Sequence, residues 1–291
     1  MIAVLTIVHG RHEHLRNQRR ALLTSERAAD LHVVVAMNDP QVRRALSDVE
    51  GYGPPVVLAQ VAADPVGLPL AAARNRAAEI ALDGGADVLV FLDVDCLPTP
   101  SLIGQYAHAV GERRGAGQYP AVWCGATARL PRMEGPGDYP VAAPEVLSVM
   151  AVPDRDRPVL DPGEVLVEPD LTRFWSLNFA LGWSDWTAIG GFDTAYVGYG
   201  GEDTDFGQRL GRCGGSMIWT GGAAALHQWH ETQSPPVSHL DDIVRNANLF
   251  AQRWGWWPMG GWLEGFREQG LAYQDGTGWH LAAEHLTRKS S

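Results

Sequence analysis

Short apolar runs alternate with helix-like segments at the start of the chain, and this alternation restricts the fold more than any other feature. The apolar runs span residues 2–8, 31–37, 55–61 and 86–92. The helix-like segments between them span residues 11–29, 40–46 and 68–82. Continuously apolar strands are buried on both faces, and strands that alternate with helices pair in parallel through crossovers. We therefore predict an α/β fold, with a Rossmann-like sheet that carries helices on both faces.

Polar residues follow these predicted strands and should gather at one rim, because ligands bind at the carboxyl ends of parallel strands. His9-Gly10-Arg11 follows the first strand, Asn38-Asp39 the second and Asp93-Val94-Asp95 the fourth. Two acids at i and i+2 after a buried strand point the same way. Their oxygens suit Mg²⁺ or Mn²⁺, which also bind diphosphate oxygens. The alternative is an ordinary strand-ending turn.

A second acidic motif, G-Y-G-G-E-D-T-D-F, spans residues 198–206. Its glycines allow a tight turn, and carboxylates in the first turn of a helix are held ionised by the helix dipole. We predict that helix over residues 205–210, with the acids facing a cleft. A surface turn with capping acids is the alternative. Arg74, on the predicted helix 68–82, either reaches the rim and pairs with phosphate or is solvated.

The rest of the chain continues the α/β pattern. Further strands are predicted at residues 121–130, 174–182, 216–220 and 223–229, and further helices at 100–110, 183–189 and 239–254. Residues 131–171 are rich in Pro, Gly and Asp and have little periodicity, which indicates a long excursion that is either functional or disordered. Residues 254–262 contain four tryptophans.

Charge and composition exclude several classes of protein. The net charge is −11 and there is no long basic run, so we expect neither nucleic acid nor an anionic membrane as a partner. Three scattered cysteines without a C-x-x-C pair indicate neither a disulfide framework nor a cysteine zinc site. The residues that follow Met1 do not indicate a signal peptide, and the sequence contains no run of 18 apolar residues. We therefore expect a cytoplasmic protein without a transmembrane segment.

The order of these motifs resembles that of the GT-A glycosyltransferases, a resemblance that covers residues 1–253. The G-G-F-D run at 190–193 and the G-Y-G-G-E-D-T-D-F motif are similar to β-1,4-galactosyltransferases, bacterial chondroitin polymerase and polypeptide N-acetylgalactosaminyltransferases. Tyr199 stands where these families usually carry Trp. The resemblance implies a single GT-A domain, with a nucleotide-sugar half (1–98), an acceptor and catalytic half (99–253) and a Trp-rich extension (254–291).

The same resemblance implies a nucleotide-sugar donor, most simply a UDP-sugar, bound with Mn²⁺ or Mg²⁺. Asp95 would ligate the metal, and Asp93 would contact the metal through water or the ribose. A histidine would complete the ligands. We prefer His227, because its separation along the sequence from Pro235 and from residues 240–243 matches the spacing in the galactosyltransferases. His230 is the alternative. On a strand, positions i and i+3 face opposite ways, so one of the two should lie elsewhere. The expected donor site comprises His9, Arg11, Asn38, Asp39, Arg74, Asp93, Val94 and Asp95.

For the chemistry, the resemblance implies Asp203 as general base and Glu202 as a ligand of sugar hydroxyls, with inversion at the anomeric carbon. Asp205 would instead orient the helix. The acceptor would be a carbohydrate, a natural product or a peptide. Trp175, Trp183 and Tyr199 are candidates for stacking on sugar, with core packing as the alternative. A retaining transferase of the same fold and a non-catalytic nucleotide-sugar or glycan-binding module remain alternatives.

Overall fold

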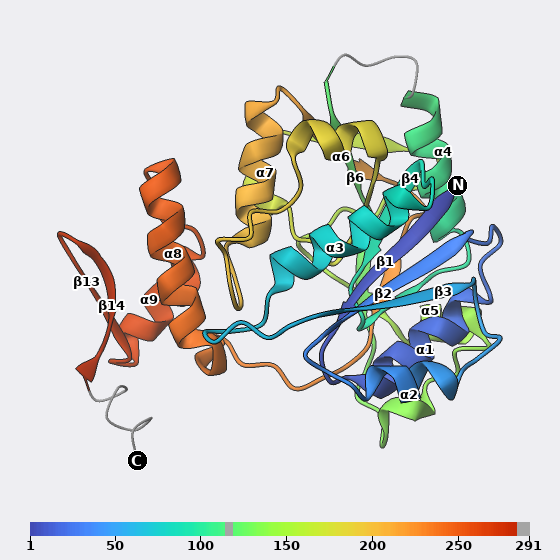
Figure 1. Cartoon of the computed structure of the whole chain (residues 1–291), viewed down its shortest axis with the longest axis horizontal. Coiled ribbons are helices and arrows are strands. Elements are labelled where there is room, and N and C mark those ends of the chain that lie inside the picture. Colours follow the sequence, from blue (N-terminus) through green and yellow to red (C-terminus); the bar gives the residue numbers. More distant parts are fainter. Residues whose placement is uncertain (114–118, 284–291) are drawn as a thin grey trace.

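The computed structural model describes residues 1–113 and 119–283. Its main sheet has eight strands in the order β3-β2-β1-β4-β10-β6-β11-β9, and Figure 1 shows β1, β2, β3 and β4 side by side in it. The first four of these positions are parallel, whereas β10 runs antiparallel to both β4 and β6. The strands are β1 Ile2–Val8, β2 Leu31–Met37, β3 Val56–Val61, β4 Val88–Leu92, β6 Ala121–Cys124, β9 Val165–Glu168, β10 Asn178–Gly182 and β11 Ser216–Thr220.

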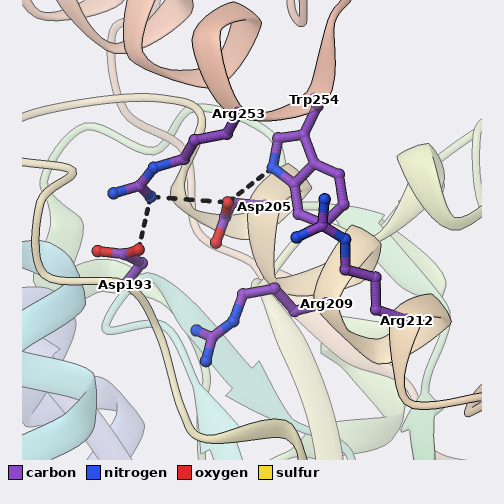
Figure 2. Close-up of a pocket in the computed structure, with 6 residues that line it drawn as sticks. All are labelled: Asp193, Asp205, Arg209, Arg212, Arg253 and Trp254. Carbon is purple, nitrogen blue, oxygen red and sulfur yellow. Dashed lines mark hydrogen bonds and ion pairs between the residues drawn. The ribbon is translucent and has the colours of Figure 1, made fainter.

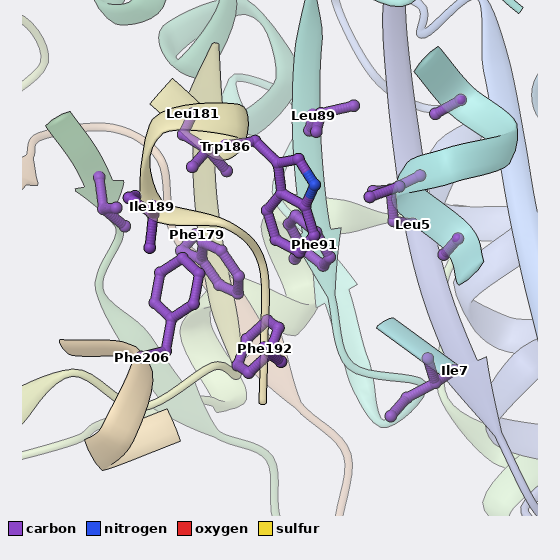
Figure 3. Packing of buried hydrophobic residues seen from close by; sticks show 14 of the residues in the cluster. Leu5, Ile7, Leu89, Phe91, Phe179, Leu181, Trp186, Ile189, Phe192 and Phe206 are labelled. Carbon is purple, nitrogen blue, oxygen red and sulfur yellow. The ribbon is translucent and has the colours of Figure 1, made fainter. Parts of the chain in front are cut away.

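Helices cover both faces of this sheet, as the sequence predicted. One face packs on α3 (Leu70–Asp83), α6 (Trp183–Ile189) and α7 (Glu202–Arg212). The other packs on helices α1 His12–Leu22, α2 Val42–Ser47 and α4 Leu102–Arg113. The core of the first face is aromatic: Phe91 stacks on Phe179 at 4.5 Å, and Phe192 on Phe206 at 4.6 Å (Figure 3). Through Phe206, α7 and its acidic first turn are held against the centre of the sheet.

A smaller sheet, in the order β5-β12-β7-β8, lies beside the carboxyl end of β4. Its strands are β5 Cys96–Pro98, β7 Thr127–Arg129, β8 Val152–Pro153 and β12 Ala225–His227. The single strand predicted at 121–130 is therefore wrong, because the chain leaves the main sheet after β6 and enters the small sheet as β7. The break falls at Gly125, where a Cβ atom would lie 1.7 Å from the Ala223 carbonyl oxygen. Only glycine permits this close approach.

The excursion at 131–171 is an ordered part of the structure rather than a loop without secondary structure. It contains η1 Pro136–Asp138, α5 Pro144–Met150, β8 and the edge strand β9, and is followed by η2 Leu171–Arg173. Arg157, buried at 3% exposure, donates hydrogen bonds to the carbonyls of Gly125 (3.0 Å) and Trp175 (2.6 Å). These bonds fix the excursion to the ends of β6 and β10.

The C-terminal part forms a separate layer on the far side of α7 from the sheet (Figure 1). It comprises η3 Val237–His239, α8 Leu240–Trp254, α9 Gly260–Glu268, β13 Ala272–Asp275 and β14 Gly278–Leu281. Residues of α8, α9 and the hairpin share one hydrophobic cluster. The packing thus groups α8 with α9 and the hairpin, and the division after residue 253 stays a prediction. Residues 284–291 of the predicted extension lie outside the described residues.

Across residues 1–113 and 119–283, no helix is both long enough and apolar enough to cross a bilayer. The cytoplasmic location stays a prediction.

Candidate active site

The two acidic motifs meet through Arg74. This residue lies on α3 and is buried at 5% exposure. Its Nη1 donates to Glu202 Oε1 at 3.1 Å and its Nη2 donates to Asp93 Oδ1 at 3.3 Å. The alternative that Arg74 is a solvated helix residue is therefore wrong. Motifs more than 100 residues apart form one charged chain at the rim of the sheet, Asp93–Arg74–Glu202.

The glycine turn brings the acids into the first turn of α7. The helix begins at Glu202, three residues earlier than predicted, because Gly200 and Gly201 take left-handed conformations with φ of 93° and 89°. A Cβ atom at Gly198 would lie 2.2 Å from Cγ of Asp242 on α8, so that position also requires glycine.

Two side chains of helix α8 form hydrogen bonds with the backbone of the same turn. Asp242 Oδ2 accepts a hydrogen bond from the Tyr199 backbone N–H at 3.1 Å. Asn246 is fully buried and donates to the carbonyl of Gly200 at 2.8 Å. The position of the acids therefore depends on the C-terminal layer as well as on the sheet.

Asp203 titrates near neutral pH. Burial and the adjacent negative charge of Glu202 raise its pKa to about 7, although Arg74 and the backbone N–H of Thr204 act in the opposite direction. The Thr204 N–H donates to Oδ1 at 2.9 Å. A carboxylate with a pKa close to the working pH has the proton affinity that a general base needs.

A second cluster forms around Asp95, which is 7% exposed. Its carboxylate lies 3.6 Å from His227 Nε2 and 3.4 Å from His230 Nε2, and one donor atom from each residue falls within 4.8 Å of the others. Arg11 also donates to Asp95 Oδ2. Burial alone would raise the pKa of Asp95, but the two histidines and Arg11 outweigh it and lower that pKa.

Both histidines face Asp95, so the expectation that one would point away is wrong. The predicted strand 223–229 ends at His227, and the chain then turns at Gln228 and brings His230 back. The donor set fits a divalent cation, because one carboxylate and two imidazoles converge. His230 Nδ1 is 3.0 Å from the Glu231 carbonyl, which leaves Nε2 as the acceptor. Burial lowers the pKa of His227 and favours its neutral, ligating form.

Asp93 is not a member of this cluster in the described residues. Its carboxylate is directed to Arg74, so the metal or ribose contact expected of it stays a prediction. The Val94 side chain is buried in the core beneath α1 and α2, which leaves only its backbone for a ligand. The Cys96 thiol is also buried, and burial raises its pKa, so this cysteine is packed rather than reactive.

The ends of β1 and β2 are tied together beside this cluster. Asp39 Oδ2 accepts hydrogen bonds from the Gly10 N–H (2.7 Å) and from His12 Nε2 (2.8 Å). Burial alone would raise the pKa of Asp39, but these bonds outweigh it and lower that pKa. His9 and Asn38 are exposed at the same rim, with Asn38 at φ 48°. The structure thus groups the predicted donor residues in one place.

Among the aromatic candidates, two lie near the rim and one does not. Tyr199 stacks on His239 at 4.6 Å and on Trp262 at 5.8 Å. Burial and the acids of both motifs raise the Tyr199 pKa to about 12. Trp175 lies three residues before the start of β10, on the rim side of that strand, and is 37% exposed. Trp183, however, follows β10 and its N–H donates to the Asp87 carbonyl, which places it at the opposite edge. Trp183 is therefore not positioned to stack on a sugar at the rim.

Sequence reasoning missed a buried amide network that holds the Asp95 cluster. Gln228, fully buried, lies between the two histidines and accepts from Asn17 Nδ2 at 2.8 Å. Its Nε2 donates to the His14 carbonyl at 3.2 Å, and its backbone N–H donates to the Asp95 carbonyl at 2.7 Å. From α1, Gln18 Nε2 donates to the Asp93 carbonyl at 2.8 Å. No sequence signal marks these amides, because Asn and Gln on a helix usually face solvent.

We expect Gln228→Leu to weaken Mn²⁺ binding about tenfold or more, because outer-shell contacts orient the ligands. The buried Asn17 amide would lose the Gln228 oxygen as an acceptor, which is expected to lower the free energy of unfolding by about 2 kcal/mol. Manganese titration and urea unfolding measure the two effects. Gln252→Leu, at an exposed position of α8, is the matched control. Unchanged Mn²⁺ affinity in Gln228→Leu would contradict the positioning role.

Comparison with known proteins shows similarity to glycosyltransferases. Residues 167–228 match a family described as the N-terminal domain of galactosyltransferase. The validoxylamine A glucosyltransferase of Streptomyces hygroscopicus subsp. limoneus is 29% identical over 267 residues, which cover 87% of this chain and 56% of that protein. The chain thus spans about half the length of the curated relatives it matches.

Two solved structures share the fold. The S. aureus TarS 1–349 structure has a TM-score of 0.57 at 12% identity and covers 86% of this chain and 64% of its own. The structure of GalNAc-T7 with UDP, GalNAc and Mn²⁺ has a TM-score of 0.53 at 13% identity and covers 87% of this chain and 50% of its own. The chain therefore has the GT-A fold and resembles the galactosyl- and N-acetylgalactosaminyltransferases, as its motifs predicted.

Proposed function

We propose that this protein is a metal-dependent, inverting glycosyltransferase that moves a hexose or N-acetylhexosamine from a UDP-sugar to an acceptor hydroxyl. The observation that carries the proposal is the Asp93–Arg74–Glu202 chain, in which Arg74 and Glu202 are buried and Asp93 is half-buried. It joins the candidate diphosphate site at Asp93-Val94-Asp95 to Glu202, the neighbour of the candidate base Asp203. The glycosyltransferase relatives and the UDP-containing structural neighbour support the same reaction class.

At the donor side, Asp95, His227 and His230 would hold Mn²⁺ or Mg²⁺. The bound cation would stabilise the negative charge that develops on the diphosphate leaving group. Arg74 and Arg11 add positive charge at the same rim, and each already contacts an acid of the Asp93-Val94-Asp95 motif. His9, Asn38 and Asp39 would contact the nucleoside.

At the acceptor side, Asp203 would remove the proton of the attacking hydroxyl as the new bond to the anomeric carbon forms. In-line attack from the face opposite the diphosphate inverts that carbon. Glu202 Oε1 is held by Arg74, while Oε2 is buried and has no hydrogen-bond partner within the described residues. This oxygen is suited to accept a hydrogen bond from a sugar hydroxyl, since a buried unpaired acceptor is costly.

Tyr199, His239 and Trp262 form an aromatic wall beside the proposed base. An aromatic face suits the C–H face of a sugar or a flat natural product. The acceptor class, whether carbohydrate, natural product or peptide, would be selected here. Glucose is the first transferred sugar to test, because one relative is named as a glucosyltransferase.

A thermal-shift panel of UDP-sugars with and without Mn²⁺ tests the proposal. Ligand binding stabilises the folded state by an amount that grows with concentration over Kd, so we expect a rise in Tm that requires the metal. Proton NMR of the product would then give its anomeric configuration. An α-linked product from an α-linked donor would show a retaining enzyme, and binding without any transfer would show a non-catalytic module. If no UDP-sugar shifts Tm even with Mn²⁺, the assignment fails.

The raised pKa of Asp203 predicts a pH-dependent cost in stability. With a pKa of about 7 in the folded state against an ordinary 3.8, its ionisation opposes folding as the pH rises through that interval. We expect Asp203→Asn to raise the free energy of unfolding by up to about 4 kcal/mol near pH 8, at about 1.4 kcal/mol per pKa unit, and by little near pH 4. Urea unfolding of the metal-free protein measures this. Asp39→Asn is an opposite-sign control, because the pKa of Asp39 is lowered. Equal effects at both pH values would contradict the assignment.

A further inference from the structure

A cavity of about 320 Å³ lies between α7 and the C-terminal end of α8 (Figure 2). Six side chains line it, and none has a role in the proposed transfer: Asp193, Asp205, Arg209, Arg212, Arg253 and Trp254. Small-ligand pockets begin at about 300 Å³, so the volume suffices for one compact ligand.

The cavity lies further along the helix that carries the proposed base. Asp205, Arg209 and Arg212 follow Glu202 at i+3, i+7 and i+10, so the four residues share one side of α7. At a rise of about 1.5 Å per residue, the cavity-lining residues begin about 5 Å beyond Glu202 and extend to about 15 Å. Tyr196 is buried, and its hydroxyl donates to Asp205 Oδ1 at 3.2 Å.

Asp205 presents an unused acceptor at the cavity. The residue is 1% exposed, and its Oδ1 also accepts from Trp254 Nε1 at 2.8 Å. Its Oδ2 is buried and has no hydrogen-bond partner in the described part of the chain. Figure 2 shows this second oxygen directed into the space bounded by Asp193 and Arg209. A buried carboxylate oxygen without a donor is costly unless a ligand or water supplies one.

Arg212 presents unused donors at the same cavity. Its guanidinium lies over the Trp254 ring, 3.9 Å from the ring centroid. Among residues 1–113 and 119–283 no hydrogen bond or ion pair engages it. The other two arginines are occupied: Arg209 donates to the carbonyls of Gly191 and Ile189, and Arg253 pairs with Asp193 at 2.5 Å. A guanidinium that lies over an aromatic ring keeps its N–H groups, which point outward in its own plane, available for hydrogen bonds.

The charges around the cavity favour an uncharged ligand. Two carboxylates and three guanidinium groups line it together, so an anion would meet Asp193 and Asp205, and a cation would meet three arginines. A hydroxyl group can donate to a carboxylate and accept from a guanidinium at once. Neighbouring hydroxyls on one ring would serve Asp205 and Arg212 together, and Trp254 offers an aromatic face for the ring's C–H groups.

We propose that the cavity between α7 and α8 is a second, non-catalytic binding site for a neutral saccharide ring. The inference goes beyond the proposed transfer reaction, because it requires neither the metal nor the nucleotide. A saccharide bound here would tether a larger glycan close to the acids of α7.

Saturation-transfer difference NMR on the full chain, without metal or nucleotide, tests this site. The probes are the methyl glycosides of glucose, galactose and N-acetylglucosamine, with glycerol and sodium phosphate as comparison ligands. We expect at least one glycoside to bind with millimolar affinity and to alter tryptophan fluorescence. Arg212→Ala and Asp205→Asn should each weaken that binding about tenfold, the effect of losing one good hydrogen bond.

Arg267→Ala is the matched control, because it removes an exposed arginine from α9, away from the cavity. Arg212 is exposed, so its truncation leaves the core intact, and Asp205→Asn keeps the acceptor for Trp254. The proposal is overturned if no glycoside binds, if both variants bind as well as the wild type, or if glycerol or phosphate binds equally. Asp203→Asn should still bind the glycoside, so failure here is distinguishable from failure of the proposed transfer function.

Discussion

Replacing Asp203 with Asn is expected to lower kcat by about 10²- to 10⁴-fold, the usual contribution of a general base. An amide cannot take up the proton of the acceptor hydroxyl, while its size and its contact with the Thr204 N–H are kept. Binding of UDP-sugar and Mn²⁺ should be unchanged, which calorimetric titration measures beside the initial rates. The loss should therefore appear in kcat rather than in the affinity for the donor.

The pH dependence of kcat in the wild type should show the ionisation of Asp203. Because burial raises the pKa of Asp203 to about 7, kcat is expected to rise with pH through neutrality as the base ionises. The remaining activity of Asp203→Asn should lack this inflection. Asp185→Asn is the control, since burial also raises the pKa of Asp185, on α6 at the opposite edge of the sheet. Undiminished transfer by Asp203→Asn would assign the base to another group.

The second large effect is expected from Asp95→Asn. Loss of an outer-shell contact already weakens metal sites by about 10- to 100-fold, so loss of the carboxylate ligand should weaken Mn²⁺ binding by at least about 100-fold. Transfer should fall by a similar or larger factor, because the leaving diphosphate loses its neutralising charge. Manganese titration monitored by electron paramagnetic resonance gives the affinity without requiring turnover. Normal Mn²⁺ affinity in this variant would place the metal elsewhere.

Single alanine variants of the two histidines separate the possible ligand sets. Equal losses of Mn²⁺ affinity in His227→Ala and His230→Ala would support the three-residue set that the geometry offers. A loss confined to His227→Ala would favour the ligand pattern that the family resemblance implies. His280→Ala, in the hairpin β13–β14, controls for removal of a histidine remote from the cluster.

The core of the fold was predictable because its signals are local. A continuously apolar run such as 31–37 indicates a strand buried on both faces, and alternation with helices indicates parallel order. The strand predicted at 121–130 failed because its break depends on a distant atom, the Ala223 carbonyl opposite Gly125. The helix start at Glu202 also depends on distant residues, since Asp242 and Asn246 hold the preceding turn.

The sequence alone determined the α/β sheet, the rim where its strands end and the two acidic motifs that belong there. These follow from periodicity and residue chemistry within short windows. Only the tertiary structure decided that Arg74 joins Asp93 to Glu202, and that both His227 and His230 face Asp95. It also decided that Asp203 is buried beside Glu202, which raises the pKa of Asp203 to about 7. Such properties arise from burial and from charges brought close by folding, which no short stretch of sequence contains.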